Sequence, residues 1–329
     1  MVTVISLFAG CGGSSLGYKW AGYNELLAVD FEKNAVETFK LNFPDIPVWE
    51  KDIKQVIGKE ILKFCKIKKG QLDVLDGSPP CQGFSTAGKF NVNDIRNDLF
   101  KEYVRLINDL QPKVFVMENV SGMIKGKMKG KFIEIITTLK SLNYQVKCKL
   151  LNSMWYDVPQ SRERLIFIGV RNDLELQPVF PKPNKNFITV GNAIKGIEDK
   201  RFLIPKSYIQ WAVKLKPMQS VQYIHPKGFG FNMTKLDWKR PSLTLTKTHT
   251  PAVGLLHPKE HRFLSVNEMK AICSFPESFI FPNGTTNSNT IINVAHRLGN
   301  AVMPKFMQAI AETIKQNILL NYFRPHEKV

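Results

Sequence analysis

The sequence has few cysteines, and none has the spacing of a zinc or disulfide framework. The five thiols, Cys11, Cys65, Cys81, Cys148 and Cys273, are odd in number, far apart and form no C-x-x-C pair. We therefore expect no metal site and no disulfide scaffold. Isolated thiols fit a reducing intracellular compartment, so we expect a cytoplasmic protein.

Long apolar runs and a secretory leader are also missing. No stretch approaches the ~20 consecutive apolar residues that a membrane-spanning helix requires. The opening MVTVISLFAGCGG has no charged amino-terminal region and leads straight into a glycine-rich motif, which argues against a signal peptide. We expect a soluble protein with no membrane partner.

Acidic residues are scarce relative to basic ones. The chain of 329 residues has 28 Asp and Glu against 46 Lys and Arg, a formal net charge of +18. Such an excess attracts polyanions and speeds their encounter with the protein. Scattered solvated lysines would give the same composition. Nucleic acid is nevertheless the partner that this balance favours, which would associate the protein with the nucleoid.

Short apolar runs alternate with longer amphipathic ones up to residue 171. Buried strands are predicted at residues 3–8, 26–29, 72–75, 114–117 and 165–170, and helices at 14–21, 33–42, 99–110 and 132–142. This alternation predicts a mostly parallel α/β sheet, covered on both faces, that binds ligands at the carboxyl ends of its strands.

The texture of the sequence changes after residue 171. Residues 177–187 contain three prolines and predict an extended linker, and residues 241–250 predict a strand entering a loop. No helix–strand alternation is visible up to about residue 288, whereas residues 304–322 predict a helix that packs on the first domain. We expect a catalytic and cofactor-binding domain (1–171 plus 290–329) and a smaller, mostly irregular or β domain (172–289).

A candidate cofactor site follows the first predicted strand. The segment FAGCGG, which supplies Phe8, Ala9, Gly10, Gly12 and Gly13, opens a helix, so its backbone can turn sharply and offer free N–H groups. Further along the chain, Asp30 is placed to accept hydrogen bonds from ribose hydroxyls, Phe31 to stack on an adenine, and Asp52, with Ile53, to bind the adenine amino group. Nicotinamide enzymes, flavoproteins and methyltransferases share such a loop and acid.

A candidate nucleophile follows the third predicted strand. The segment DGSPPCQGFS (76–85) places Cys81 at the carboxyl edge of the sheet, in a loop stiffened by Pro79 and Pro80. Buried cysteines are usually small hydrophobic residues, but neighbouring prolines and glycines do not make a packed interior.

Two further segments carry polar side chains toward the same edge. VFVMENV (114–120) ends in Glu118, a candidate acid or an ordinary turn residue. In VPQSRERLIFIGV (158–170), Gln160, Arg162 and Arg164 alternate with the period that points side chains to one side of a strand. Arginines there hold phosphates or carboxylates, although an exposed strand edge would give the same pattern.

Together these segments resemble the DNA cytosine-5 methyltransferase family, in its stand-alone prokaryotic modification form, over nearly the whole chain. The family's motifs are similar, in order, to FAGCGG, PPCQ, ENV (118–120), QSRER (160–164), RFLSVNE (262–268) and HRLGNAV (296–302). Six motifs in the expected order are far more specific than any one of them.

The resemblance implies a class I S-adenosylmethionine-dependent methyltransferase fold, which is Rossmann-like with a mixed sheet, and S-adenosylmethionine as cofactor. It adds Pro80, Leu99, Asn300 and Ala301 to the cofactor site. The implied reaction methylates carbon 5 of a flipped-out cytosine in a specific double-stranded DNA sequence through a covalent bond from Cys81 to carbon 6. The implied catalytic residues are Cys81, Glu118, Arg162 and Arg164.

The resemblance also implies where DNA binds. The target carbon is inaccessible in a stacked duplex, so the loop 82–97 is expected to close over an extruded base. The variable segment 172–261 takes the place of the target recognition region. The expected DNA contacts are Gln82, Ser85, Arg96, Gln160, Arg240, Thr244 and Lys247. We expect a monomer, possessing at most an independently acting restriction endonuclease as partner.

Three other interpretations remain. One branch of the family modifies tRNA, but its Cys-Phe-Thr signature is not found here, and the polar variable segment favours duplex DNA. A nicotinamide oxidoreductase would leave PPCQ, Glu118 and the arginines unexplained. A DNA-binding module without catalysis is disfavoured by the intact set of Cys81, Glu118 and Arg164.

Overall fold

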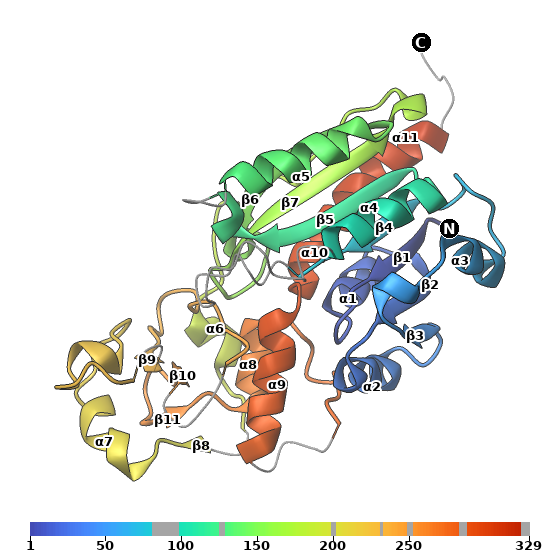
Figure 1. Cartoon of the computed structure of the whole chain (residues 1–329). Helices are drawn as coiled ribbons and strands as arrows, with labels where there is room; N and C mark the ends of the chain where they lie inside the picture. The colour runs from blue at the N-terminus through green and yellow to red at the C-terminus, as the bar shows by residue number, and fades with distance from the viewer. Residues whose placement is uncertain are drawn as a thin grey trace. The chain divides into compact units, whose positions relative to one another are not determined.

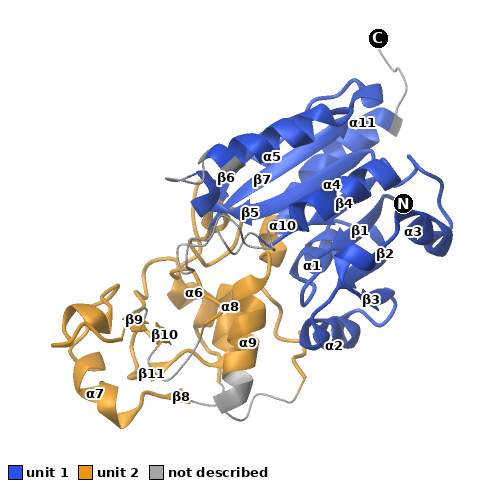
Figure 2. Cartoon of the chain, viewed as in Figure 1, with its two compact units in different colours: residues 1–151, 163–182, 307–329 blue, residues 152–162, 183–306 orange. Residues whose placement is uncertain are grey.

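The computed structural model describes residues 1–80, 99–124, 129–198, 202–230, 233–248, 253–282 and 288–323. The chain forms two compact units (Figure 2). Unit 1 comprises Met1–Leu151, Glu163–Lys182 and Met307–Val329, and unit 2 comprises Asn152–Arg162 and Pro183–Phe306. The division at residues 171 and 290, which the change in sequence texture predicts, stays a prediction beside these structural boundaries.

Unit 1 is built on a seven-stranded mixed sheet in the order β3-β2-β1-β4-β5-β7-β6. Its strands are β1 (Thr3–Leu7), β2 (Asn24–Asp30), β3 (Val48–Glu50), β4 (Val74–Gly77), β5 (Val114–Val120), β6 (Tyr144–Asn152) and β7 (Glu163–Arg171). Strands β1 to β5 pair in parallel, and β7 runs antiparallel to β5. The five predicted strands are confirmed, and the short edge strand β3 and the long strand β6 are additions.

Helices cover both faces of this sheet (Figure 1), as predicted. The helical segments are α1 (Gly13–Trp20), α2 (Lys33–Asn42), η1 (Ile53–Gln55), α3 (Gly58–Cys65), α4 (Leu99–Leu110), η4 (Ser121–Ile124), α5 (Lys129–Ser141) and η7 (Asn172–Leu174). Helix α4 buries Tyr103, Leu106 and Leu110, the face that its three-to-four-residue apolar spacing predicts.

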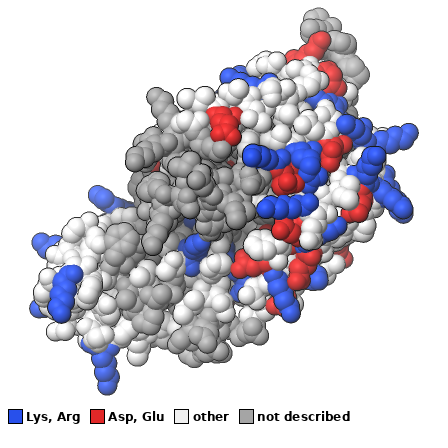
Figure 3. All heavy atoms as spheres, viewed as in Figure 1, with Lys and Arg blue, Asp and Glu red and all other residues white. Residues whose placement is uncertain are grey.

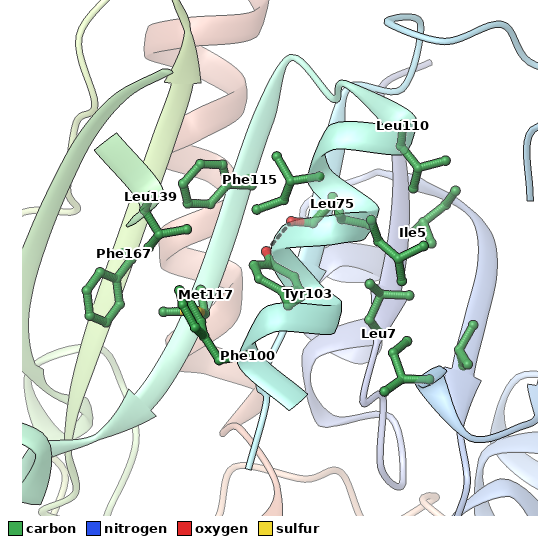
Figure 4. Packing of buried hydrophobic residues seen from close by; sticks show 14 of the residues in the cluster. Ile5, Leu7, Leu75, Phe100, Tyr103, Leu110, Phe115, Met117, Leu139 and Phe167 are labelled. Carbon is green, nitrogen blue, oxygen red and sulfur yellow. Dashed lines mark hydrogen bonds between the residues drawn. The ribbon is translucent and has the colours of Figure 1, made fainter. Parts of the chain in front are cut away.

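The alternation of side chains along β4 and β5 separates two environments. Leu75, Phe115 and Met117 point to the face covered by α4, where they join one large apolar cluster (Figure 4). Asp76, one residue after Leu75, points to the opposite face, where it accepts a hydrogen bond from the Tyr18 hydroxyl of α1. A carboxylate is thus buried within the sheet layer.

The carboxyl-terminal helices return to unit 1 from Met307 onward, as expected. They are α10 (Pro304–Ile314), the π-helical turn η9 (Lys315–Leu319) and α11 (Leu320–Phe323). The Tyr23 hydroxyl donates to the Ala311 carbonyl at 2.9 Å, and the Lys315 ammonium donates to the Ala21 carbonyl at the end of α1. These bonds tie the last helices to the first helical layer.

Unit 2 contains a four-stranded sheet in the order β8-β11-β10-β9 and more helix than the sequence predicts. Its elements are η6 (Ser153–Trp155), α6 (Val190–Ile194), β8 (Phe202–Leu203), α7 (Lys206–Ala212), η8 (Val221–Tyr223), β9 (Met233–Lys235), β10 (Gly254–Leu256), β11 (Arg262–Phe263), α8 (Val266–Ile272) and α9 (Ser288–Asn300). The strand predicted at 241–250 is wrong for its described part, residues 241–248. Ser242 forms a single bridge with Gln160, and the Thr244 hydroxyl bonds the Ser161 carbonyl.

The described residues contain no helix long and apolar enough to cross a membrane. Among the same residues, no group of three or more His, Cys, Asp or Glu side chains is placed to hold a metal ion.

Candidate active site

The glycine-rich loop after β1 has a backbone that few residues tolerate. Phe8, Gly10 and Gly12 have φ angles of 56°, 57° and 93°, in the left-handed region. A Cβ on Gly12 would lie 2.3 Å from the Phe43 ring, whereas one on Gly10 would meet nothing within 4 Å. Gly12 is therefore required by packing, and Gly10 borders open space that a ligand can approach. Gly13 begins α1.

Asp30, at the end of β2, ties this loop to the neighbouring strand end. Its two oxygens accept the backbone N–H groups of Gly10 and Glu32, both at 2.8 Å, and the buried Ala9 donates its N–H to the Val29 carbonyl. Burial raises the pKa of Asp30, and these backbone bonds oppose the shift. Each oxygen accepts more than one hydrogen bond, so Asp30 can also receive a ribose hydroxyl.

The adjacent strand ends supply an exposed ring and a second carboxylate. Phe31 is 67% exposed, an unusual position for a phenyl ring unless a partner covers it. Asp52 follows β3 and caps η1 by accepting the Lys54 N–H at 3.0 Å, while Ile53 is buried beneath it. An open glycine, an exposed ring and two carboxylates on three neighbouring strand ends fit the adenosine part of S-adenosylmethionine.

The end of β4 is held from α4 and β5. The Tyr103 hydroxyl donates to the carbonyl of Leu75 at 3.1 Å (Figure 4). It also donates to the carbonyl of Val116 at 2.8 Å. A Cβ on Gly77 would lie 2.5 Å from the Tyr103 ring, so glycine is required there. The Asn119 amide donates to the Pro79 carbonyl at 3.3 Å. The chain that leads to the candidate nucleophile therefore leaves the sheet at a rigid point.

Some predicted residues cannot be compared with this geometry. Cys81, Gln82, Ser85 and Arg96 lie outside the described residues. Pro80, the last described residue before them, is half-buried, as is Leu99 at the first position of α4.

Glu118 and Arg164 form an ion pair at the ends of β5 and β7. The Arg164 Nε lies 2.6 Å from the Glu118 Oε1, and the two side chains are 14% and 11% exposed. Antiparallel pairing places Val120 opposite Arg164, which brings the arginine alongside the carboxylate two residues earlier. The structure thus brings together two of the predicted catalytic residues and fixes their mutual orientation.

Two buried carboxyls near this site escape motif-based reasoning. Burial raises the pKa of Asp76 to about 8, with the charges of Glu25 and Glu118 adding to the effect. Burial likewise raises the pKa of Glu25 to about 7, against the opposing hydrogen bond from Ser15. Their sequence signal is an acidic residue inside an otherwise apolar strand.

Arg162 and Gln160 lie buried in unit 2, which corrects the expectation that they point with Arg164 to one open side. Gln160 has no exposed surface and its amide donates to the Cys273 sulfur at 3.3 Å, and its DNA contact stays a prediction. Arg162 is 3% exposed, and its guanidinium donates to the carbonyls of Leu245, Gly299 and Ala301 at 2.7 to 3.2 Å.

Arg162 joins two segments for which the sequence predicts different functions, DNA contact for 244–247 and cofactor binding for 300–301. A Cβ on Gly299 would lie 2.3 Å from the backbone nitrogen of Lys247, so the end of α9 touches the 244–247 segment. Asn300 ends α9, and Ala301 is buried. Lys247 and Arg240 are exposed and thus accessible to a polyanion.

The late Arg/Glu motif is a buried ion pair in unit 2. The Arg262 guanidinium donates to both oxygens of Glu268, at 2.7 and 2.8 Å, and Glu268 also completes a capping box with Ser265 at the start of α8. His257 lies 3.6 Å from the same carboxylate, and burial lowers its pKa. This motif therefore holds β11 and α8 together.

Comparison with known proteins decides the family. The sequence profile of the C-5 cytosine-specific DNA methylases matches residues 2–316. The chain belongs to this family. It is a DNA (cytosine-5-)-methyltransferase, and the family is one of S-adenosylmethionine-dependent enzymes.

Named relatives resemble this methylase over most of their length. The type II methyltransferase M1.HphI of Haemophilus parahaemolyticus is 34% identical, over 95% of this chain and 86% of its own. M.DdeI of Desulfomicrobium norvegicum is 30% identical, over 95% and 88%. A putative prophage DNA modification methyltransferase from E. coli shares the fold at a TM-score of 0.75 and 24% identity, covering 97% of this chain and 100% of that one. The predicted fold class is confirmed.

Proposed function

We propose that this methylase acts on a cytosine extruded from a specific double-stranded DNA sequence and that Cys81 forms a transient bond to carbon 6 of the base. The observation that carries the proposal is the Glu118–Arg164 pair, which lies beside the strand end from which the Pro79–Pro80 loop departs. A fixed carboxylate next to the loop of the nucleophile is the arrangement that addition to a pyrimidine ring needs.

In the addition step, negative charge develops on the base and N3 needs a proton. Carbon 5 of cytosine is a poor nucleophile until the Cys81 thiolate adds to carbon 6, which forms the S–C6 bond and shifts electron density toward carbon 5 and N3. Glu118, which is protonated or shares a proton with N3 of the bound base, gives that proton to N3 and is left as a carboxylate. Arg164, at 2.6 Å, stabilises that carboxylate and can also contact O2 of the base.

Bound S-adenosylmethionine would supply the methyl group that carbon 5 receives. Asp30 would hold its ribose, Phe31 would stack on its adenine, and Asp52 would accept from the adenine amino group. Loss of the carbon 5 proton to a solvent base then expels the Cys81 thiolate, and N3 returns its proton to the Glu118 carboxylate, which restores the aromatic ring. By resemblance, Asn300 and Ala301 stay proposed cofactor contacts.

We assign Arg162 a positioning role in this reaction. Its guanidinium is committed to three carbonyls, which join the 244–247 segment to the Gly299–Ala301 turn. DNA-contacting and cofactor-contacting segments would therefore share one anchor. Thr244 and the exposed Arg240 and Lys247 stay our proposed DNA contacts.

Charge supports a polyanionic substrate in unit 2. Residues 202–236 contain five lysines and no acidic residue, and Figure 3 shows lysine and arginine side chains over the α7 end of unit 2, in contrast to the mixed charges over unit 1. If ~6–10 phosphates are contacted, affinity should fall by ~10³–10⁵ between about 50 and 200 mM salt.

The relatives' type II names support a restriction–modification context, in which a monomeric methylase protects the sites of an independently acting endonuclease. The test is to express the enzyme with a plasmid and map 5-methylcytosine by bisulfite sequencing. One recurring methylated sequence is expected, and Cys81→Ser should abolish it.

Trapping tests the covalent step separately. Duplexes carrying 5-fluorocytosine at the mapped site should become irreversibly attached to the wild-type enzyme in the presence of S-adenosylmethionine, because fluorine cannot leave as the proton does. Attachment at a residue other than Cys81, or methylation of RNA without DNA, would contradict the proposal.

A further inference from the structure

Arg105 of α4 forms hydrogen bonds to the backbone of the turn that follows β3. Its Nη2 donates to the carbonyl of Ile53 at 3.2 Å and to that of Val56 at 2.8 Å. These carbonyls belong to the first residue of η1 and to the residue just after it, so one guanidinium nitrogen spans the whole turn. The sequence gives no motif that pairs residue 105 with residues 53 and 56.

The guanidinium is itself held in place. Its Nε donates to Glu102 at 2.8 Å and its Nη1 to Asp109 at 3.4 Å, one turn before and one turn after on the same helix. A Cβ on Gly58 would lie 2.3 Å from the Asp109 Cβ, so glycine lets the chain after the turn pass close to α4. Arg105 thus has a fixed direction, toward the turn.

The turn needs such an anchor. A single 3₁₀ turn has poor hydrogen-bond geometry, and here the Val56 N–H donates to the Ile53 carbonyl at 3.2 Å. The side chains of Ile53 and Val56 are buried in the core, which holds both ends of the turn against unit 1. The hydrogen bonds to their carbonyls prevent the turn from rotating about the line that joins these two ends. The direction of the Asp52 carboxylate, which caps this turn, depends on that rotation.

We propose that Arg105 is a positioning residue for cofactor recognition: through the Ile53 and Val56 carbonyls it holds Asp52 in the orientation that accepts the adenine amino group. The inference rests on the proposed placement of the adenine. Asp52 Oδ1 accepts the Lys54 N–H, and within the described part of the chain Oδ2 has no hydrogen-bond partner. That oxygen is free to receive the 6-amino group.

A matched arginine separates positioning from general stability. Arg171 also donates from one nitrogen to two carbonyls, those of Gly70 and Gln111, and pairs with an acid, Asp173. Gly70 and Gln111 precede β4 and β5, so this second clamp lies at the amino ends of the parallel strands, away from the cofactor edge. Arg171→Met removes the same chemistry from the same unit.

The experiment compares two nucleosides that differ at the group Asp52 would read. Dissociation constants for S-adenosylhomocysteine and S-inosylhomocysteine, which has an oxo group in place of the 6-amino group, are measured by calorimetry for the wild type, Arg105→Met, Arg105→Lys and Arg171→Met. Thermal unfolding is recorded for each. The wild type should prefer the adenosyl compound.

In Arg105→Met we expect the adenosyl compound to bind about tenfold more weakly while the inosyl compound changes little, because one well-placed charged hydrogen bond is typically worth a factor of that order. Arg105→Lys, which can still reach one carbonyl, should recover part of the preference. Arg171→Met should lower the melting temperature and keep the full preference. The KM for S-adenosylmethionine should rise in Arg105→Met at an unchanged kcat.

The outcomes distinguish the placement of the adenine at Asp52 from the positioning role of Arg105. A wild type without preference would refute the placement of the adenine at Asp52, and with it the role of Arg105. A wild-type preference that persists in Arg105→Met would leave the cofactor site intact and refute the positioning role alone. If Arg105→Met does not fold, Arg105→Lys and Glu102→Gln, which frees the guanidinium, give the same comparison.

Discussion

Replacing Asp76 with asparagine tests whether this buried carboxyl is neutral at physiological pH. Asp76 is 2% exposed on β4, between the glycine-rich loop and Glu118, and accepts the Tyr18 hydroxyl at 3.3 Å. Burial raises its pKa to about 8, and the Glu25 and Glu118 charges contribute in the same direction. Asparagine has nearly the same shape and carries no charge at any pH.

The size and sign of the effect follow from proton linkage. Between the ordinary pKa of about 3.9 and the folded value of about 8, the unfolded chain has lost a proton that the folded chain retains. Stability is therefore fully present below pH ~4 and falls by ~1.36 kcal/mol per pH unit as the pH rises to ~8. From pH ~5.5 to ~7.5, Asp76 should cost the wild type on the order of 2.7 kcal/mol, a loss that Asp76→Asn avoids.

Hydrogen exchange at the β1 and β4 amides measures the free energy of opening for unit 1 alone. The difference between Asp76→Asn and wild type should move in favour of the variant by on the order of 2.7 kcal/mol between the two pH values. Glu37→Gln, which changes an exposed carboxyl on α2, serves as the control and should show no such trend. An equal difference at both pH values would refute the neutrality of Asp76.

Three further substitutions test other parts of the structure. Glu118→Gln should lower kcat by ~10²–10⁴ while DNA affinity is retained, as measured by single-turnover methylation and filter binding, because the amide cannot transfer a proton to N3. Arg262→Met should destabilise unit 2 by ~3–5 kcal/mol in urea unfolding, since it leaves the Glu268 carboxylate buried and unpaired. Adding Glu268→Gln should restore part of that loss, and no recovery would contradict the assignment. Gly299→Ala should destabilise by ~1–3 kcal/mol, because its Cβ has no room, and an unchanged melting temperature would show that the contact is loose.

The sheet of unit 1 is predictable because its strands are buried on both faces. Continuous apolar runs such as residues 114–117 indicate a buried strand. The three-to-four-residue spacing of Tyr103, Leu106 and Leu110 identifies the buried face of α4. Strand β3 has three residues, two of them half-buried and one exposed, and is too short to stand out as an apolar run. Strand β6 alternates exposed and buried residues at the sheet edge, and a search for continuous apolar runs does not detect this pattern.

Unit 2 resists the same approach because its elements are short and its contacts are long-range. The segment 241–248 has the β-branched residues of a strand, but its partners are the 159–162 backbone and the Arg162 guanidinium, neither of which local propensity encodes. For the same reason motif spacing placed Arg162 and Arg164 on one side. The backbone passes from unit 2 to unit 1 between them.

The glycine-rich loop, the Pro79–Pro80 segment and the ENV motif have one physical property in common: each lies at the carboxyl end of a strand of unit 1. Tyr103 locks β4 to β5 through two carbonyls, Asn119 holds the Pro79 carbonyl, and Arg105 holds the turn after β3 from the same helix that supplies Tyr103. Helix α4 thus connects the proposed adenine site to the base of the nucleophile's loop through two side chains, Arg105 and Tyr103, neither of which is a proposed ligand contact. Preorganisation of this kind places the cost of ordering the site in folding rather than in catalysis. Loosening α4 should therefore impair cofactor recognition and methyl transfer together, whereas a change at Arg105 alone should separate them.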